Sequence, residues 1–148
     1  MGWANRLTQI ALGTGARLMR SVRLLQSEGF VSIRDEAEVG EAASLVSVFL
    51  GAGGMGSRID GAIALTGKGA FAEMGGALLT RASRKQEAAV VVRHAAPEGT
   101  SRQVWRAVAA DSSTASLRRA SRWPATRRRP TASSRCAGCC SSARRRST

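Results

Sequence analysis

Four glycines in the segment GAGGMG are the first residues whose spacing could carry chemistry. They fit the pattern G-x-G-x-x-G and stand at Gly51, Gly53, Gly54 and Gly56. In a dinucleotide-binding site, such glycines let the backbone approach a pyrophosphate at the start of a helix. Ser57 would then begin the helix, and Glu73 stands close to the place of the ribose-binding acid. Because no series of strand–helix–strand units follows, a glycine loop without a ligand is the favoured interpretation, and the sequence predicts no cofactor.

Arginines in the last third of the chain are the second group. The net charge is +13, and most of it comes from residues after 100. Arginine pairs with phosphates through two parallel hydrogen bonds, and tryptophan stacks on exposed bases. Trp105 and Trp123 lie among these arginines. The candidate nucleic-acid-binding residues form two runs, Arg127, Arg128, Arg129 and Arg144, Arg145, Arg146.

Three cysteines and one histidine are the remaining candidates for metal or redox chemistry. The cysteines have the spacing of half a zinc site and stand at Cys136, Cys139 and Cys140. A zinc site needs four ligands, and His94 is the only histidine in the chain. The sequence therefore predicts no metal site. Without a catalytic constellation, it also leans toward a protein that is not an enzyme.

The glycine segment also resembles a motif of a known protein family. The letters GGMGS over residues 53–57, followed by Asp60, are similar to a short motif in a family of small uncharacterised bacterial proteins. In that family the motif follows a helical region and precedes an Asn-Asp pair, which Ile59 and Asp60 replace here. The resemblance covers only this segment, and it implies no activity, cofactor or partner.

Apolar residues three or four positions apart predict that the front of the chain is mainly helical. The predicted helices cover residues 3–27, 33–50, 57–66 and 70–85. Ser32 and Asp35 have the spacing of a capping box, which would begin the second helix. A run of three valines favours a strand over 88–93, so a small α/β fold is the alternative. No internal repeat is evident.

These elements predict a small, mainly helical domain over residues 1–96 and a disordered basic tail over residues 97–148. The tail is rich in Arg, Ser, Ala and Thr. We expect it to bury too little apolar surface to offset about 1–2 kcal/mol of backbone entropy per residue. The amino-acid usage reflects GC-rich codons, so the tail can also be compositional drift without an evolved function.

The leading hypothesis is a non-enzymatic protein whose tail binds polyanions such as nucleic acid without sequence specificity. One alternative is a fragment of a dinucleotide-binding module, and another is a protein whose tail has no function. The most apolar stretch, residues 42–56, is shorter than the ~20 residues that a transmembrane helix needs. We expect a cytoplasmic location. Organelle targeting through the arginine-rich N-terminal helix is the alternative, and the oligomeric state stays open.

Overall fold

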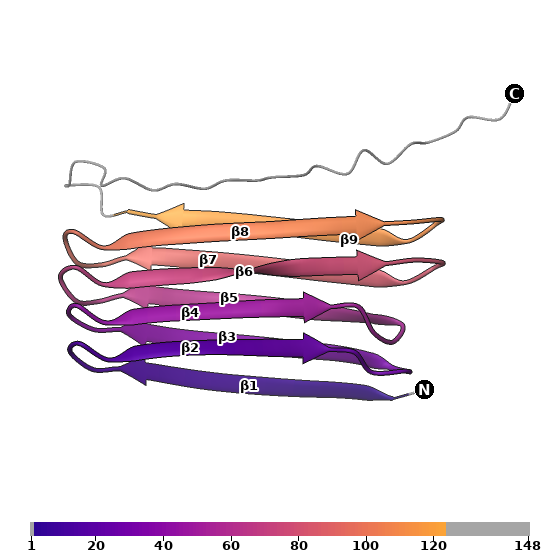
Figure 1. Ribbon diagram of the computed structural model, residues 1–148, viewed down its shortest axis with the longest axis horizontal. Coiled ribbons are helices and arrows are strands. Elements are labelled where there is room, and N and C mark those ends of the chain that lie inside the picture. Colours follow the sequence, from indigo (N-terminus) through magenta and orange to yellow (C-terminus); the bar gives the residue numbers. More distant parts are fainter. Residues whose placement is uncertain (1, 124–148) are drawn as a thin grey trace, which may run out of the picture.

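The computed structural model describes residues 2–123, which form nine strands and no helix (Figure 1). The strands are β1 (Trp3–Leu12), β2 (Arg17–Leu24), β3 (Phe30–Val39), β4 (Ser44–Gly51), β5 (Gly56–Leu65), β6 (Phe71–Thr80), β7 (Lys85–His94), β8 (Thr100–Ala109) and β9 (Thr114–Arg122). Sheet A has the order β1-β3-β5-β7-β9, and sheet B has the order β2-β4-β6-β8. All pairings are parallel. The chain is therefore a two-sided β-solenoid in which each coil adds one strand to each sheet.

The coils have a nearly constant length. One line of register partners in sheet A runs through Trp3, Phe30, Gly56, Lys85 and Thr114, whose residue numbers differ by 27, 26, 29 and 29. A single coil cannot bury its own apolar face, so such coils are stable only as a stack. The chain thus contains an internal repeat that the sequence analysis did not detect.

One residue in each coil adopts a left-handed backbone where the chain passes from sheet A to sheet B. Values of φ are 69°, 50°, 68° and 59° at Gly15, Ala42, Gly69 and Glu98. Each turn also rests on the next one, because Gly15 N donates to Glu41 O at 2.8 Å and Ala42 N to Lys68 O at 2.9 Å. Glycine adopts this conformation without a steric cost. Only two of the four positions hold glycine, which explains why the repeat is hard to see.

The core lies between the two sheets and takes alternate residues from each strand. In β5, for example, Ile59 and Ile63 are buried while Arg58 and Ala62 are exposed. Trp105 of β8 is fully buried and stacks on Phe49 of β4, with 6.1 Å between the ring centroids. Burial of this apolar surface, worth roughly 25 cal/mol per Å², is the main source of stability.

The predicted helical fold is wrong, because the segments expected to be helices contain β1 to β6. Residues i and i+4 share one face of a helix and also one face of a strand, so Ile59 and Ile63 fit both structures. Ser32 and Asp35, which we expected to cap a helix, both lie inside β3. The strand predicted over residues 88–93 is confirmed within β7.

The disorder predicted from residue 97 is also contradicted as far as the structure describes the chain. Residues 100–122 form β8 and β9, which pair with β6 and β7. An isolated segment of this composition would need a core of its own. In a solenoid, an added coil extends a core that already exists and buries its apolar face against the preceding coil.

An ion pair lies inside the solenoid near its N-terminal coil. Arg20 of β2 points inward, and its Nη2 is 3.2 Å from Oδ2 of Asp35 on β3, with side-chain exposures of 17% and 6%. The guanidinium also lies over the ring of Phe49, 5.9 Å from its centroid. Charged groups are tolerated in a protein interior only where they are paired.

Breaking this pair should destabilise the fold. We expect Asp35→Ala to lower the free energy of unfolding by about 3 kcal/mol, because it leaves the Arg20 guanidinium buried without its carboxylate. The double variant Arg20→Met with Asp35→Leu should recover most of that loss, since two apolar side chains replace the pair. Urea denaturation followed by circular dichroism measures both effects. Equal midpoints for wild type and Asp35→Ala would contradict the prediction.

Candidate functional site

The structure places the four glycines of the GAGGMG segment at the turn from β4 to β5. Gly51 ends β4 and Gly56 begins β5. A Cβ on Gly53 would lie 2.5 Å from Gln26 N of the preceding coil, so this glycine allows two turns to stack closely. Ser57 belongs to a strand, and no helix begins anywhere in residues 2–123. The helix N-terminus that a pyrophosphate site needs is thus missing from the described part of the chain.

A buried pair of polar side chains holds this turn. Ser57 Oγ donates a hydrogen bond to Gln86 Oε1, and Gln86 Nε2 donates to Gly53 O at 3.2 Å. Ser57 and Gln86 are register partners on β5 and β7, and both are fully buried. Buried polar groups need such partners. The serine of the GGMGS segment therefore has a structural contact, and the resemblance to the small bacterial family stays a prediction.

Because Gly53 serves close stacking, adding a methyl group there should be costly. We expect Gly53→Ala to destabilise the protein by about 1–3 kcal/mol, since the obstacle is backbone that cannot move aside. Gly13→Ala is the matched control, because a Cβ at that position meets nothing within 4 Å. It should be neutral or stabilise by up to about 1 kcal/mol. Thermal unfolding compares the two, and equal melting temperatures would refute this role of Gly53.

The single histidine lies in the core, away from any surface site. His94 is 1% exposed, and its Nε2 is 2.9 Å from Oγ of Ser101. Its ring stacks on Trp123, with 3.4 Å between the centroids. Burial lowers the pKa of His94, an effect that a backbone hydrogen bond at Gly99 partly opposes. Because His94 and Ser101 are both buried, a substrate cannot reach them, and we interpret their hydrogen bond as a structural contact of a neutral histidine.

The lowered pKa of His94 predicts a pH-dependent stability. Its ordinary pKa is 6.5, so the unfolded chain takes up a proton at a higher pH than the folded chain. The stability that comes from burying a neutral His94 is complete above about pH 6.5, and it is lost as the pH falls toward the lower pKa of the folded state. His94→Gln should remove the decrease in unfolding free energy between about pH 6.5 and 5.5, where carboxylates titrate little. Urea titrations at both pH values measure it, and an unchanged slope in the variant would count against the buried neutral histidine.

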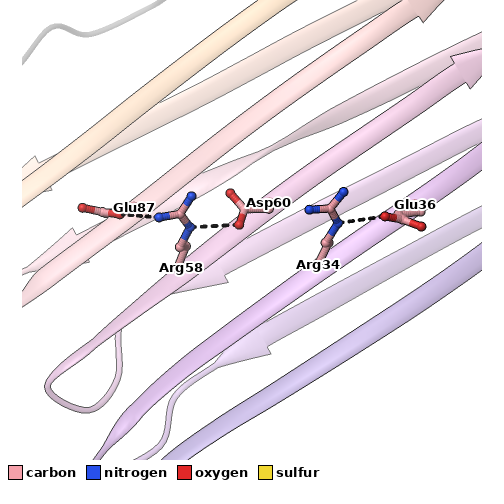
Figure 2. A network of polar contacts seen from close by, with 5 residues as sticks. All are labelled: Arg34, Glu36, Arg58, Asp60 and Glu87. Carbon is pink, nitrogen blue, oxygen red and sulfur yellow. Dashed lines mark hydrogen bonds and ion pairs between the residues drawn. The ribbon is translucent and has the colours of Figure 1, made fainter.

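The outer face of sheet A carries a network of charged side chains (Figure 2). On β3, Arg34 Nε is 2.8 Å from Glu36 Oε1. On β5, Arg58 Nε is 2.9 Å from Asp60 Oδ2, and its Nη1 reaches Glu87 Oε2 on β7 at 3.7 Å. The hydrogen bond and charge of Asp60 raise the pKa of Arg58. Exposed ion pairs add little stability, so the network chiefly makes this face polar.

A shallow groove of about 500 Å³ lies on the same face. Residues of all five strands of sheet A line it. They include Glu36 and Glu38 of β3, Ala64 of β5, Arg93 of β7 and Arg122 of β9. The groove can receive a segment that carries both signs of charge. In residues 2–123, no group of three or more His, Cys, Asp or Glu is placed to hold a metal ion.

Neither the network nor the groove was recognised as a candidate from the sequence. The available signal was the pairs Arg34 with Glu36 and Arg58 with Asp60, each two residues apart. That spacing puts both charges on one face of a strand. Residues two positions apart do not face each other on a helix. The helices predicted over residues 33–50 and 57–66 therefore conceal these pairs.

Several sequence candidates lie outside the described residues. They are the two arginine runs, Arg127, Arg128, Arg129 and Arg144, Arg145, Arg146, and the cysteines Cys136, Cys139 and Cys140. The tryptophans expected to stack on bases are both described. Trp105 is buried in the core and Trp123 stacks on His94. Base stacking is therefore contradicted for Trp105 in this fold.

Comparison with known protein families identifies the family of this chain. Residues 1–120 match the family model described as SUF system FeS cluster assembly, SufBD core domain. The chain belongs to the SufBD core family. The match includes β8 and most of β9, which the sequence analysis had assigned to the tail. No curated protein and no solved structure gives a significant match.

Membership in the SufBD core family corrects the function expected from the sequence. The description of the family names SUF iron–sulfur cluster assembly. Non-specific nucleic-acid binding is therefore wrong as the leading function. Neither the dinucleotide-binding module nor a protein with a functionless tail matches the family. As expected, the described part of the chain contains no helix that is long and apolar enough to cross a membrane.

Proposed function

We propose that this chain works in SUF iron–sulfur cluster assembly as a subunit whose solenoid presents binding surfaces to other proteins of the system. The observation that carries the proposal is the SufBD core match over residues 1–120, which spans all coils of the solenoid but the end of β9. Stacked repeats form extended surfaces that are well suited to binding other proteins. The two sheets give this chain two such faces, and the groove on sheet A adds a concave site to one of them.

In this proposal the iron–sulfur cluster is cargo, and the described solenoid positions the proteins that handle it. Clusters are held mainly by cysteine thiolates. The chain has three cysteines, and all of them follow residue 135, after the last strand. His94 is enclosed in the core and is held by Ser101. Thiolate ligands would therefore come from the segment after β9 or from a partner protein.

The proposed role also bears on where the protein works. We place it in the cytoplasm, where a SUF assembly system can deliver clusters to soluble enzymes. The alternative of organelle targeting relied on an amphipathic helix over residues 3–27. That segment contains β1 and β2, whose inward side chains belong to the stacked coils. The location stays a prediction.

Loss of this protein should impair iron–sulfur enzymes specifically. In a strain that relies on SUF as its only cluster assembly system, we expect deletion of the gene to lower the activity of an iron–sulfur dehydratase per molecule of enzyme, most strongly when iron is scarce. A zinc-dependent enzyme in the same extracts is the control and should not change. Re-expression of the wild-type chain should restore activity. The core variant Ile59→Asp should not, because an unpaired buried carboxylate prevents folding. Full dehydratase activity in the deletion strain would contradict the proposed function.

A further inference from the structure

The outer face of sheet B carries a continuous apolar strip. Val48 of β4 and Leu79 of β6 are both 43% exposed, and Val108 of β8 is 54% exposed. Leu50 and Ala77 are register partners between them and point the same way. Sheets that face water on one side usually present polar residues there. A continuous exposed apolar area of this kind marks a surface that another molecule covers.

Arginines lie on both edge strands of this face. Sheet B has β2 and β8 as its edge strands, and the outward residues of these strands include Arg17, Arg23, Arg102 and Arg106. Arg102 Nη1 is 3.9 Å from Glu73 Oε2. In residues 2–123, the other three have no carboxylate within ion-pair distance. On the outer face of sheet A, Arg34 and Arg58 are paired with acidic side chains. Arg93 and Arg118 of that face have no carboxylate within ion-pair distance in residues 2–123.

The width of the strip sets the kind of element that fits. Neighbouring strands lie about 4.8 Å apart, so the two arginine-bearing edge strands are separated by about 14 Å. An α-helix with its side chains is about 10–12 Å across. A helix lying on β4 and β6 would bury its apolar side on Val48, Leu50 and Leu79, and its two flanks would face the arginines. A second copy of this chain fits poorly, because arginines would then meet arginines.

We propose that the outer face of sheet B binds an amphipathic helix of a partner protein that carries Asp or Glu on both flanks of its apolar stripe. The apolar strip supplies the contact area, and the arginines select the charge of the partner. This inference goes beyond the proposed function, because it assigns a face, an element and a charge to the interaction. Its test measures binding to the surface of sheet B, and it is independent of the activity of iron–sulfur enzymes in cells.

A synthetic helix tests the proposal directly. The probe is a fluorescent peptide of about 18 residues, about 27 Å long as a helix, with a leucine stripe flanked by glutamates on both sides. A second peptide has lysines in place of the glutamates, and a third has the composition of the first with the stripe scrambled. Fluorescence anisotropy with the full chain at about 0.1 M salt measures affinity. We expect the glutamate-flanked helix to bind at least about tenfold more tightly than either control, equivalent to about 1.4 kcal/mol.

Variants on the two faces locate the binding. Val48→Lys with Leu79→Lys should abolish binding of the glutamate-flanked helix. The matched control is Trp3→Lys with Leu7→Lys on the outer face of sheet A, where the wild-type residues are 73% and 58% exposed. It should change affinity less than about twofold. Arg23→Glu with Arg106→Glu should reverse the preference toward the lysine-flanked helix. Circular dichroism verifies that each variant keeps its strands.

Three results would overturn the proposal. The first is binding that all variants retain, because the peptide would then contact arginines elsewhere in the chain. The second is a wild-type dimer in size-exclusion chromatography that becomes a monomer with Val48→Lys and Leu79→Lys, which would make the face a self-interface. The third is the loss, in these same variants, of binding to phosphatidylserine vesicles while no peptide binds at all, which would assign the face to a lipid surface. Cell activity is measured separately, so failure here leaves the proposed SUF role standing.

Discussion

The register between successive coils is the constraint on which the rest of this structure depends. Every strand after the first coil takes its backbone hydrogen bonds from the coil before it, so each turn must return the chain to the same level. That requirement fixes the coil length within a few residues and places a left-handed residue in each turn. At particular turn positions it also leaves no room for a side chain, as at Gly67, where a Cβ would lie 1.9 Å from Glu41 N.

The same register determines how polar groups enter the interior. Because partners on adjacent strands point the same way, a buried polar side chain in one coil meets the interior position of the next. Ser57 and Gln86 satisfy each other in this manner. Arg20 of β2 and Asp35 of β3 form an ion pair between the two sheets. His94 at the end of β7 forms a hydrogen bond with Ser101 of β8. Three of the buried polar contacts are therefore side-chain pairs, whereas Thr80 Oγ1 and Gln103 Oε1 are buried without a hydrogen-bond partner.

The positions of several turns could be predicted from the sequence, whereas the type of the elements between the turns could not. Gly53 with Gly54, and Gly67 with Gly69, do lie between strands, and the valine run lies in β7. The strands were missed because many apolar pairs are four residues apart, which suits both periods, and because β4 is apolar on both faces. The repeat was hidden because its fixed positions constrain φ more than residue type, so Ala42 and Glu98 stand where Gly15 and Gly69 stand in other coils.

The candidate surfaces depend on that same strand period, which is why no pattern in the sequence pointed to them. Once residues alternate between inside and outside, Arg34, Arg58 and their acidic partners lie on one face and form ion pairs there. The alternation also brings Val48, Leu50 and Leu79 together on the other face, between arginine-bearing edge strands. A stack of coils held by backbone hydrogen bonds does not need its outer side chains for stability. Their chemistry is therefore free to differ between the two faces, so sheet A presents ion pairs and a groove while sheet B presents an apolar strip, and each face suits a different partner.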